Sequence, residues 1–175
     1  MDGADATVEV YSRAHKVALF LNGTKVGEKI RGKDCRFIFK TKYHDGKLEA
    51  IAYNEEGQQV AQTALQTAGA ATRLTLLPEE KTIGKDDLCY VRIRYTDDQG
   101  EIKPLARGVV KVQVENGTLL GMGNGCSYNH DGYLNEFTDT YYGEALAVIR
   151  PNGGGDVRVK AESPYGSADV AVTVR

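Results

Sequence analysis

The run Tyr90-Val91-Arg92-Ile93-Arg94-Tyr95 places valine and isoleucine at every second position, between residues that carry a charge or a hydroxyl. Side chains of a β-strand point alternately to its two faces, so this pattern predicts a strand with one face in a core and the other in water. Six further runs alternate in the same way, at residues 7–11, 36–40, 47–53, 110–114, 156–161 and 168–174. Between them stand glycine-containing turn signals such as Asn22-Gly23 and Asn116-Gly117, which suit tight hairpins. Short strands without a long amphipathic helix predict an all-β fold of antiparallel sandwiches.

The segment Thr67-Ala68-Gly69-Ala70-Ala71 has small residues and no alternation, and it lies between two sets of predicted strands. Such a segment is typical of a domain boundary. We therefore predict two domains, residues 1–69 with five or six strands and residues 72–175 with seven or eight. A unit of fewer than about 70 residues buries only a small hydrophobic core of its own. We therefore expect the first domain to be stabilised by packing against a neighbouring domain.

Composition excludes several classes of protein. The 175 residues include 22 Lys and Arg and 24 Asp and Glu, a net charge of −2, which disfavours nucleic-acid binding. The longest apolar stretch, residues 17–21, is far shorter than the about 20 residues of a membrane-spanning helix, so we expect no membrane insertion. The N-terminus lacks the basic start and apolar run of a secretory signal, which leaves cytoplasmic, periplasmic and secreted locations open.

No motif indicates a cofactor or a metal. Gly121-Met122-Gly123-Asn124-Gly125 is similar to part of a phosphate-binding loop, but neither a helix start nor Lys-Ser/Thr follows, and a bulge or tight turn explains the glycines better. Side-chain oxygens that could bind calcium occur at Asn124, Asn129 and Asp131. Only one of these side chains is a carboxylate, which is too little negative charge for a calcium site. Three widely spaced cysteines favour buried free thiols over disulfides or zinc.

Catalytic patterns are equally weak. The sequence has no Gly-x-Ser-x-Gly elbow. Glycoside hydrolysis requires two carboxylates that face one bond. Asn54-Glu55 and Asn135-Glu136 have the order found in some glycosidases, yet the first belongs to a predicted hairpin and the second to an irregular loop. We expect both glutamates to be solvated, and the sequence assigns no catalytic residue.

The region 121–140 breaks the regular strand spacing and is rich in glycine and tyrosine. Tyrosine faces stack on sugars, and short amides and carboxylates supply directional hydrogen bonds, so this mixture suits a carbohydrate contact. The alternative is that the tyrosines cover one end of the sandwich or dock against another domain. The candidate contact residues are Tyr128, Asn129, His130, Asp131 and Tyr133, with Tyr141 and Tyr142 nearby in the sequence.

Several stretches together resemble the C-terminal β-sandwich domains of bacterial glycoside hydrolase family 2 enzymes, the β-galactosidases especially. In the first half these stretches are 8–12, 17–23, 26–27, 46–53 and 67–69, and in the second half 87–91, 97–100 with Pro104, 121–125 and 142–150. The resemblance implies two tandem antiparallel immunoglobulin-like β-sandwich domains that follow a catalytic barrel. It also implies that the catalytic glutamates belong to that upstream barrel, so none is carried over. One departure is Asp5-Ala6, which stands where family members often have a tryptophan.

Three hypotheses follow from these observations. The first is a non-catalytic C-terminal fragment of a β-galactosidase-like enzyme, inactive by itself, whose parent cleaves terminal β-galactosides and whose upstream barrel is its partner. The second is a carbohydrate-binding module that contacts β-galactosides or polysaccharide through the loop 128–142. The third is a bacterial immunoglobulin-like adhesion or spacer tandem.

Overall fold

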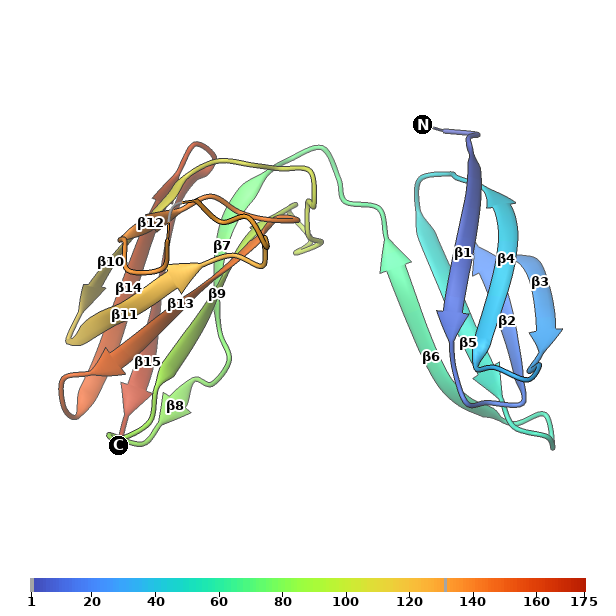
Figure 1. Cartoon of the computed structure of the whole chain (residues 1–175), viewed down its shortest axis with the longest axis horizontal. Coiled ribbons are helices and arrows are strands. Elements are labelled where there is room, and N and C mark those ends of the chain that lie inside the picture. Colours follow the sequence, from blue (N-terminus) through green and yellow to red (C-terminus); the bar gives the residue numbers. More distant parts are fainter. Residues whose placement is uncertain (1, 131) are drawn as a thin grey trace. The chain divides into compact units, whose positions relative to one another are not determined.

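The computed structural model describes residues 2–130 and 132–175, and every regular element in this part of the chain is a β-strand. The chain divides into two compact units between Thr67 and Ala68 (Figure 1). The predicted all-β sandwich fold is confirmed. Within the described residues, no helical segment has the length and hydropathy needed to cross a membrane.

The first unit is a sandwich of unequal layers. A two-stranded sheet, β1-β4, packs on a four-stranded sheet of order β3-β2-β5-β6. Phe37 and Phe39 of the small sheet meet Val17, Leu19 and Ala50 of the large one in the core. The strands are β1 (Asp5–Tyr11), β2 (Lys16–Leu21), β3 (Thr24–Ile30), β4 (Arg36–Lys42), β5 (Lys47–Tyr53) and β6 (Gln59–Gln66).

Strand β6 forms an edge that the small sheet leaves uncovered, and all eight of its residues are exposed. Residues directly opposite each other in an antiparallel pair share a face of the sheet. Leu65 lies opposite Leu48, which packs on the core, and Thr63 lies opposite the buried Ala50. Leu65 therefore points to the core side of the sheet, yet 71% of it is exposed.

The second unit is a larger sandwich with nine strands among its described residues. A five-stranded sheet of order β12-β10-β14-β15-β8 faces a four-stranded sheet of order β11-β13-β9-β7. All pairs are antiparallel except β15 with β8. The strands are β7 (Arg73–Pro78), β8 (Thr82–Ile83), β9 (Cys89–Thr96), β10 (Val110–Glu115), β11 (Gly117–Gly123), β12 (Phe137–Thr138), β13 (Glu144–Pro151), β14 (Gly155–Ser163) and β15 (Gly166–Val174). The number of strands exceeds the seven or eight expected from the sequence because the structure also contains β8 and β12, which have only two residues each.

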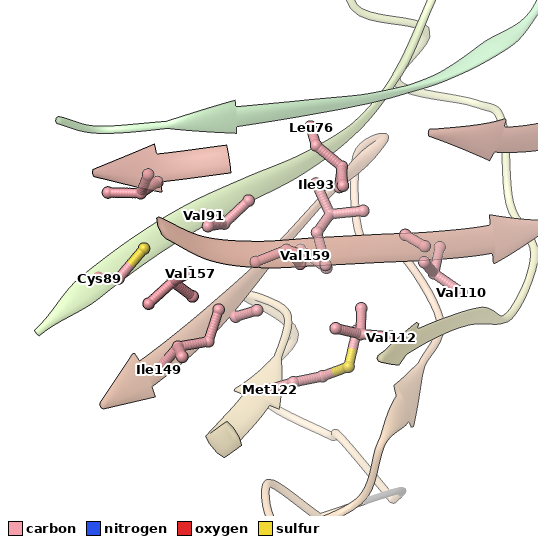
Figure 2. Close-up of a cluster of buried hydrophobic side chains, with 14 of the residues drawn as sticks. Leu76, Cys89, Val91, Ile93, Val110, Val112, Met122, Ile149, Val157 and Val159 are labelled. Carbon is pink, nitrogen blue, oxygen red and sulfur yellow. The ribbon is translucent and has the colours of Figure 1, made fainter. Parts of the chain in front are cut away.

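The core of the second unit lies between these two sheets. Val91 and Ile93 of β9, the apolar positions of the alternating run, are fully buried with Val157 and Val159 of β14. Figure 2 shows these side chains in one cluster, where Met122 of β11 also reaches toward Val112 of β10. Burial of this apolar surface is the main term that stabilises the unit.

The cysteines are all free, but only one of them fits the expectation of a buried thiol. Cys89 is buried, and this burial raises the pKa of its thiol. Cys126 is half-buried. Cys35 is exposed, so the expectation is wrong for that residue, which stands between the two strands β3 and β4 rather than in a core-facing run.

Candidate functional site

A groove of about 670 Å³ opens on the second unit at the outer face of its four-stranded sheet. Its floor is β13, whose even-numbered residues Leu146 and Val148 point away from the core and are half-buried. Gly121 and Gly123 of β11 and three tyrosines from the following loops form the sides. A volume of this size is in the range of small-molecule sites.

Two glycines of β11 let the irregular loop lie directly against the strand. A Cβ atom on Gly123 would stand 2.5 Å from Cδ1 of Tyr133, and one on Gly121 would stand 2.9 Å from the carbonyl oxygen of Tyr133. The backbone N–H of Met122 donates to that carbonyl oxygen at 2.8 Å. The strand register also shifts between Leu119 and Gly121, immediately before the stretch 121–125 for which a bulge or tight turn is predicted.

Asn124 and Asp139 fix the two ends of the loop. The Asn124 amide donates to the carbonyl oxygen of Asp139 at 2.8 Å, and its Oδ1 accepts the N–H of Cys126 at 2.9 Å. The Asp139 carboxylate accepts the N–H groups of Gly108 and Thr140 and binds the guanidinium of Arg107. Partial burial opposes ionisation of Asp139, but these donors prevail and lower its pKa. The loop is therefore held by charge and hydrogen bonds at its base.

A tight turn joins this loop to β13 and brings two tyrosines to the groove. Tyr142 and Gly143 both have positive φ, 50° and 75°, and Tyr141 and Glu144 exchange two backbone hydrogen bonds of 2.9 and 3.2 Å. Positive φ at both central residues of a two-residue hairpin defines a type I′ turn. The rings of Tyr141 and Tyr142 meet edge to face, with centroids 4.6 Å apart. The electrostatic influence of Tyr142, followed by partial burial, raises the pKa of Tyr141.

The carboxylates that line the groove are each paired with an arginine. Arg92 of β9 donates from Nε and an Nη atom to one oxygen of Glu79, at 3.1 and 2.8 Å. Arg94 donates from Nε to Glu144 at 2.6 Å. Each carboxylate along this part of the groove thus has a neutralising partner.

The structure gathers only part of the residue set that the sequence suggested. Tyr133, Tyr141 and Tyr142 line the groove. Tyr128 is 82% exposed and lies off it, as do Asn129 and His130. Asn129 donates to the carbonyl oxygen of Gly132 at 3.3 Å. Asp131 lies outside the described residues. A carbohydrate contact by this set remains a prediction.

Sequence reasoning missed the strand residues of the groove, Arg92, Glu144, Leu146 and Val148. Arg92 belongs to the alternating run 90–95, and the alternation alone assigns it only to the solvated face of the strand. The two glutamates considered for catalysis, Glu55 and Glu136, are exposed, as expected. Among the described residues no three His, Cys, Asp or Glu side chains gather as a metal would require.

Two family models match the chain in tandem. Residues 3–61 match the family described as Domain of unknown function (DUF4982), and residues 74–171 match Glycoside hydrolase family 2 C-terminal domain 5. The second match alone covers more than half of the chain. The chain therefore belongs to glycoside hydrolase family 2, as a C-terminal part of such an enzyme.

Similar proteins are much longer than this chain. Beta-galactosidase BoGH2A of Bacteroides ovatus is 31% identical over 147 residues, which are 82% of this chain and 17% of that protein. A glycosyl hydrolase family 2 member from Bacteroides cellulosilyticus is 28% identical, with a TM-score of 0.88 over 99% of this chain and 23% of its own. A β-glycosidase from Bacteroides vulgatus, 22% identical with a TM-score of 0.90 over 99% of this chain and 23% of its own, shows the same fold.

Proposed function

We propose that this chain is the non-catalytic C-terminal part of an enzyme that hydrolyses terminal β-galactosides, and that it serves that enzyme structurally. The match to a β-galactosidase of which it spans 17% supports this proposal. The chemistry of the groove supports it too. A glycosidase acid must hold a proton that it can give to the leaving group, whereas the groove carboxylates Glu79 and Glu144 are held by arginines. The reaction then belongs to a catalytic barrel upstream in the same polypeptide.

The open core-side face of β6 is the observation that carries the structural role. The two-stranded sheet of the first unit leaves this strand bare, and Leu65 stands exposed at a position where a complete sandwich would bury it. Burying a leucine side chain contributes about 1.5–3 kcal/mol. An exposed edge that is not blunted by charge invites pairing or packing, and β6 has no charged residue. The remainder of the parent polypeptide is the occupant that fits this face.

The direct test compares the complete open reading frame with the 175-residue chain. Both proteins are assayed with 4-nitrophenyl β-D-galactoside and, for comparison, with the corresponding glucuronide. We expect the complete polypeptide to release nitrophenol from the galactoside and the 175-residue chain to release none from either substrate. Turnover by the chain itself, in a preparation free of contaminating enzyme, contradicts the non-catalytic role. A complete polypeptide that cleaves only the glucuronide contradicts the assigned substrate.

A further inference from the structure

We propose that the groove on the second unit binds a neutral saccharide, with the Tyr141-Tyr142 turn as its aromatic wall. This proposal concerns the groove of the second unit alone. It goes beyond the structural role, and only the choice of the first saccharide probe rests on the proposed function.

The backbone of the turn gives the first argument. A residue with φ near 50° is an outlier when it is bulky, and type I′ turns prefer asparagine followed by glycine. The hairpin between β2 and β3 follows this rule, with Asn22 at φ 50° and Gly23 at φ 79°. At the corresponding place the second unit has Tyr142, also at φ 50°. Local stability therefore favours asparagine here, and a tyrosine at this position requires another reason.

The environment of Tyr142 indicates what that reason is. Its side chain is 63% exposed, so it does not contribute a buried core contact. It lines the groove together with Tyr141 and Tyr133, above an apolar floor of Leu146 and Val148. Aromatic rings beside such a floor suit the C–H faces of a sugar ring, which are apolar although the ring edge is polar.

The polar groups suit the hydroxyls of an uncharged ligand. Glu79 offers a carboxylate oxygen beside the Arg92 guanidinium, and Glu144 does the same beside Arg94. Each pair offers both acceptors and donors at one place. Because each of these carboxylates is already neutralised, this part of the groove has no excess charge to attract a phosphate, a uronate or a charged peptide. A neutral saccharide fits the combination of rings, apolar floor and paired charges.

The experiment uses the 175-residue chain labelled with ¹⁵N and titrated with β-1,4-galactan oligosaccharides, a neutral β-glucan oligosaccharide and an oligogalacturonate. We expect amide shifts at residues 121–125 and 141–148 with a neutral probe, and a Kd between about 1 mM and 1 μM. We expect Tyr142→Asn to weaken binding about two- to tenfold, the effect of losing one aromatic contact. Its melting temperature should equal or exceed that of the parent chain, which separates a binding defect from misfolding.

Tyr128→Ala is the matched control, since it removes an exposed tyrosine of the same loop that lies off the groove. We expect it to leave affinity unchanged. The proposal is wrong if no neutral probe shifts the groove amides, if only the oligogalacturonate does, or if Tyr142→Asn and Tyr128→Ala have equal effects.

These outcomes are separable from the activity test. If the complete polypeptide has no β-galactosidase activity but its groove binds the neutral β-glucan, the proposed function is wrong and the proposal for the groove still holds. If the complete polypeptide is an active β-galactosidase but no neutral saccharide shifts the amide signals of the groove, only the proposal for the groove is wrong.

Discussion

The Nζ atom of Lys103 lies 2.7 Å from the carbonyl oxygen of Gly69, and the same ammonium donates to the carbonyls of Ala70 and Ala71 at 2.8 and 2.9 Å. The carboxylate of Asp97 accepts the N–H of Gly69 at 2.6 Å. A cation thus holds the carbonyls of this segment and an anion holds one of its N–H groups. The two charges fix the first residues of the second unit to the loop that follows β9.

Replacing the cation of this clamp should destabilise the second unit. Lys103→Met keeps much of the apolar stem but removes three charge-assisted hydrogen bonds. Because the ammonium is only partly buried, we expect a loss of about 1–2 kcal/mol in the free energy of unfolding, measured by urea denaturation. Lys111→Met, at an exposed lysine of β10, is the control and should change stability by less than about 0.5 kcal/mol. Equal effects of the two substitutions would show that the clamp contributes nothing.

The anion of the clamp predicts a dependence of stability on acid. The N–H of Gly69 is the main cause that lowers the pKa of Asp97, and the N–H groups of Glu101 and Gln99 act in the same direction against the effect of burial. The unfolded chain, with an ordinary pKa of 3.8, therefore binds the proton first as the pH falls. The stabilisation is complete above this value and is lost as the pH falls below it, through the lowered pKa of the folded state.

Asp97→Asn tests this dependence. The difference in unfolding free energy between the parent chain and the variant should be largest near neutral pH and should shrink as the pH is lowered below about 4. Urea denaturation at several pH values measures it. Asp86→Asn, at an exposed aspartate, should follow the pH profile of the parent chain. A difference for Asp97→Asn that stays constant with pH would mean that the carboxylate charge is not what holds Gly69.

The alternating pattern identified the strands that have one apolar face and one polar face. It did not identify strands in which both faces are apolar or both are polar. All seven alternating runs lie in strands. Strand β13 does not alternate, because Leu146 and Val148 are apolar on its outer face and Ala147 and Ile149 are apolar on its inner face, in the core. Strand β6 does not alternate either, because it is an exposed edge strand and neither of its faces is uniformly apolar. The first of these misses has the same cause as the groove, since the outward apolar residues are its floor.

The tyrosine-rich loop could be singled out by composition, but its partners could not. Which tyrosines share a surface depends on the path of the loop, and that path depends on Gly121 and Gly123, which let Tyr133 approach β11. Arg92 joins them from β9, about 40 residues away in the sequence, through the pairing of β9 with β13. Such long-range pairing leaves no local signal in the sequence.

A side chain at Gly143, in the turn before β13, should destabilise the second unit. A Cβ atom there would stand 2.6 Å from the backbone oxygen of Lys103, and φ is +75°. Gly100 has a similar φ of +87° but open space around it, so Gly100→Ala measures the conformational cost alone, about 1–2 kcal/mol. We expect Gly143→Ala to cost about 1–3 kcal/mol more because backbone must move. Equal losses for both variants, measured by thermal or urea unfolding, would show that the neighbouring backbone yields without cost.

Strand β6 allows the structural role to be tested without disturbing the fold of this chain. Leu65 is exposed, so Leu65→Lys should change the stability of the 175-residue chain by less than about 0.5 kcal/mol. In the complete polypeptide the same substitution places a charge in the proposed contact with the catalytic part. There we expect a loss of about 2 kcal/mol or more, because the leucine contact is replaced by a buried charge.

Ala64→Lys is the matched control, because it puts the same charge on the same strand but on the opposite face, next to Glu49. It should leave both proteins nearly unchanged. Thermal unfolding of the two variants in the two proteins, with β-galactosidase activity after heating as a second measurement, gives four comparisons. The docking role requires that only Leu65→Lys in the complete polypeptide be strongly destabilised. If that variant unfolds like the parent enzyme, the core-side face of β6 is exposed in the enzyme as well, and its bare leucine does not hold the two parts together.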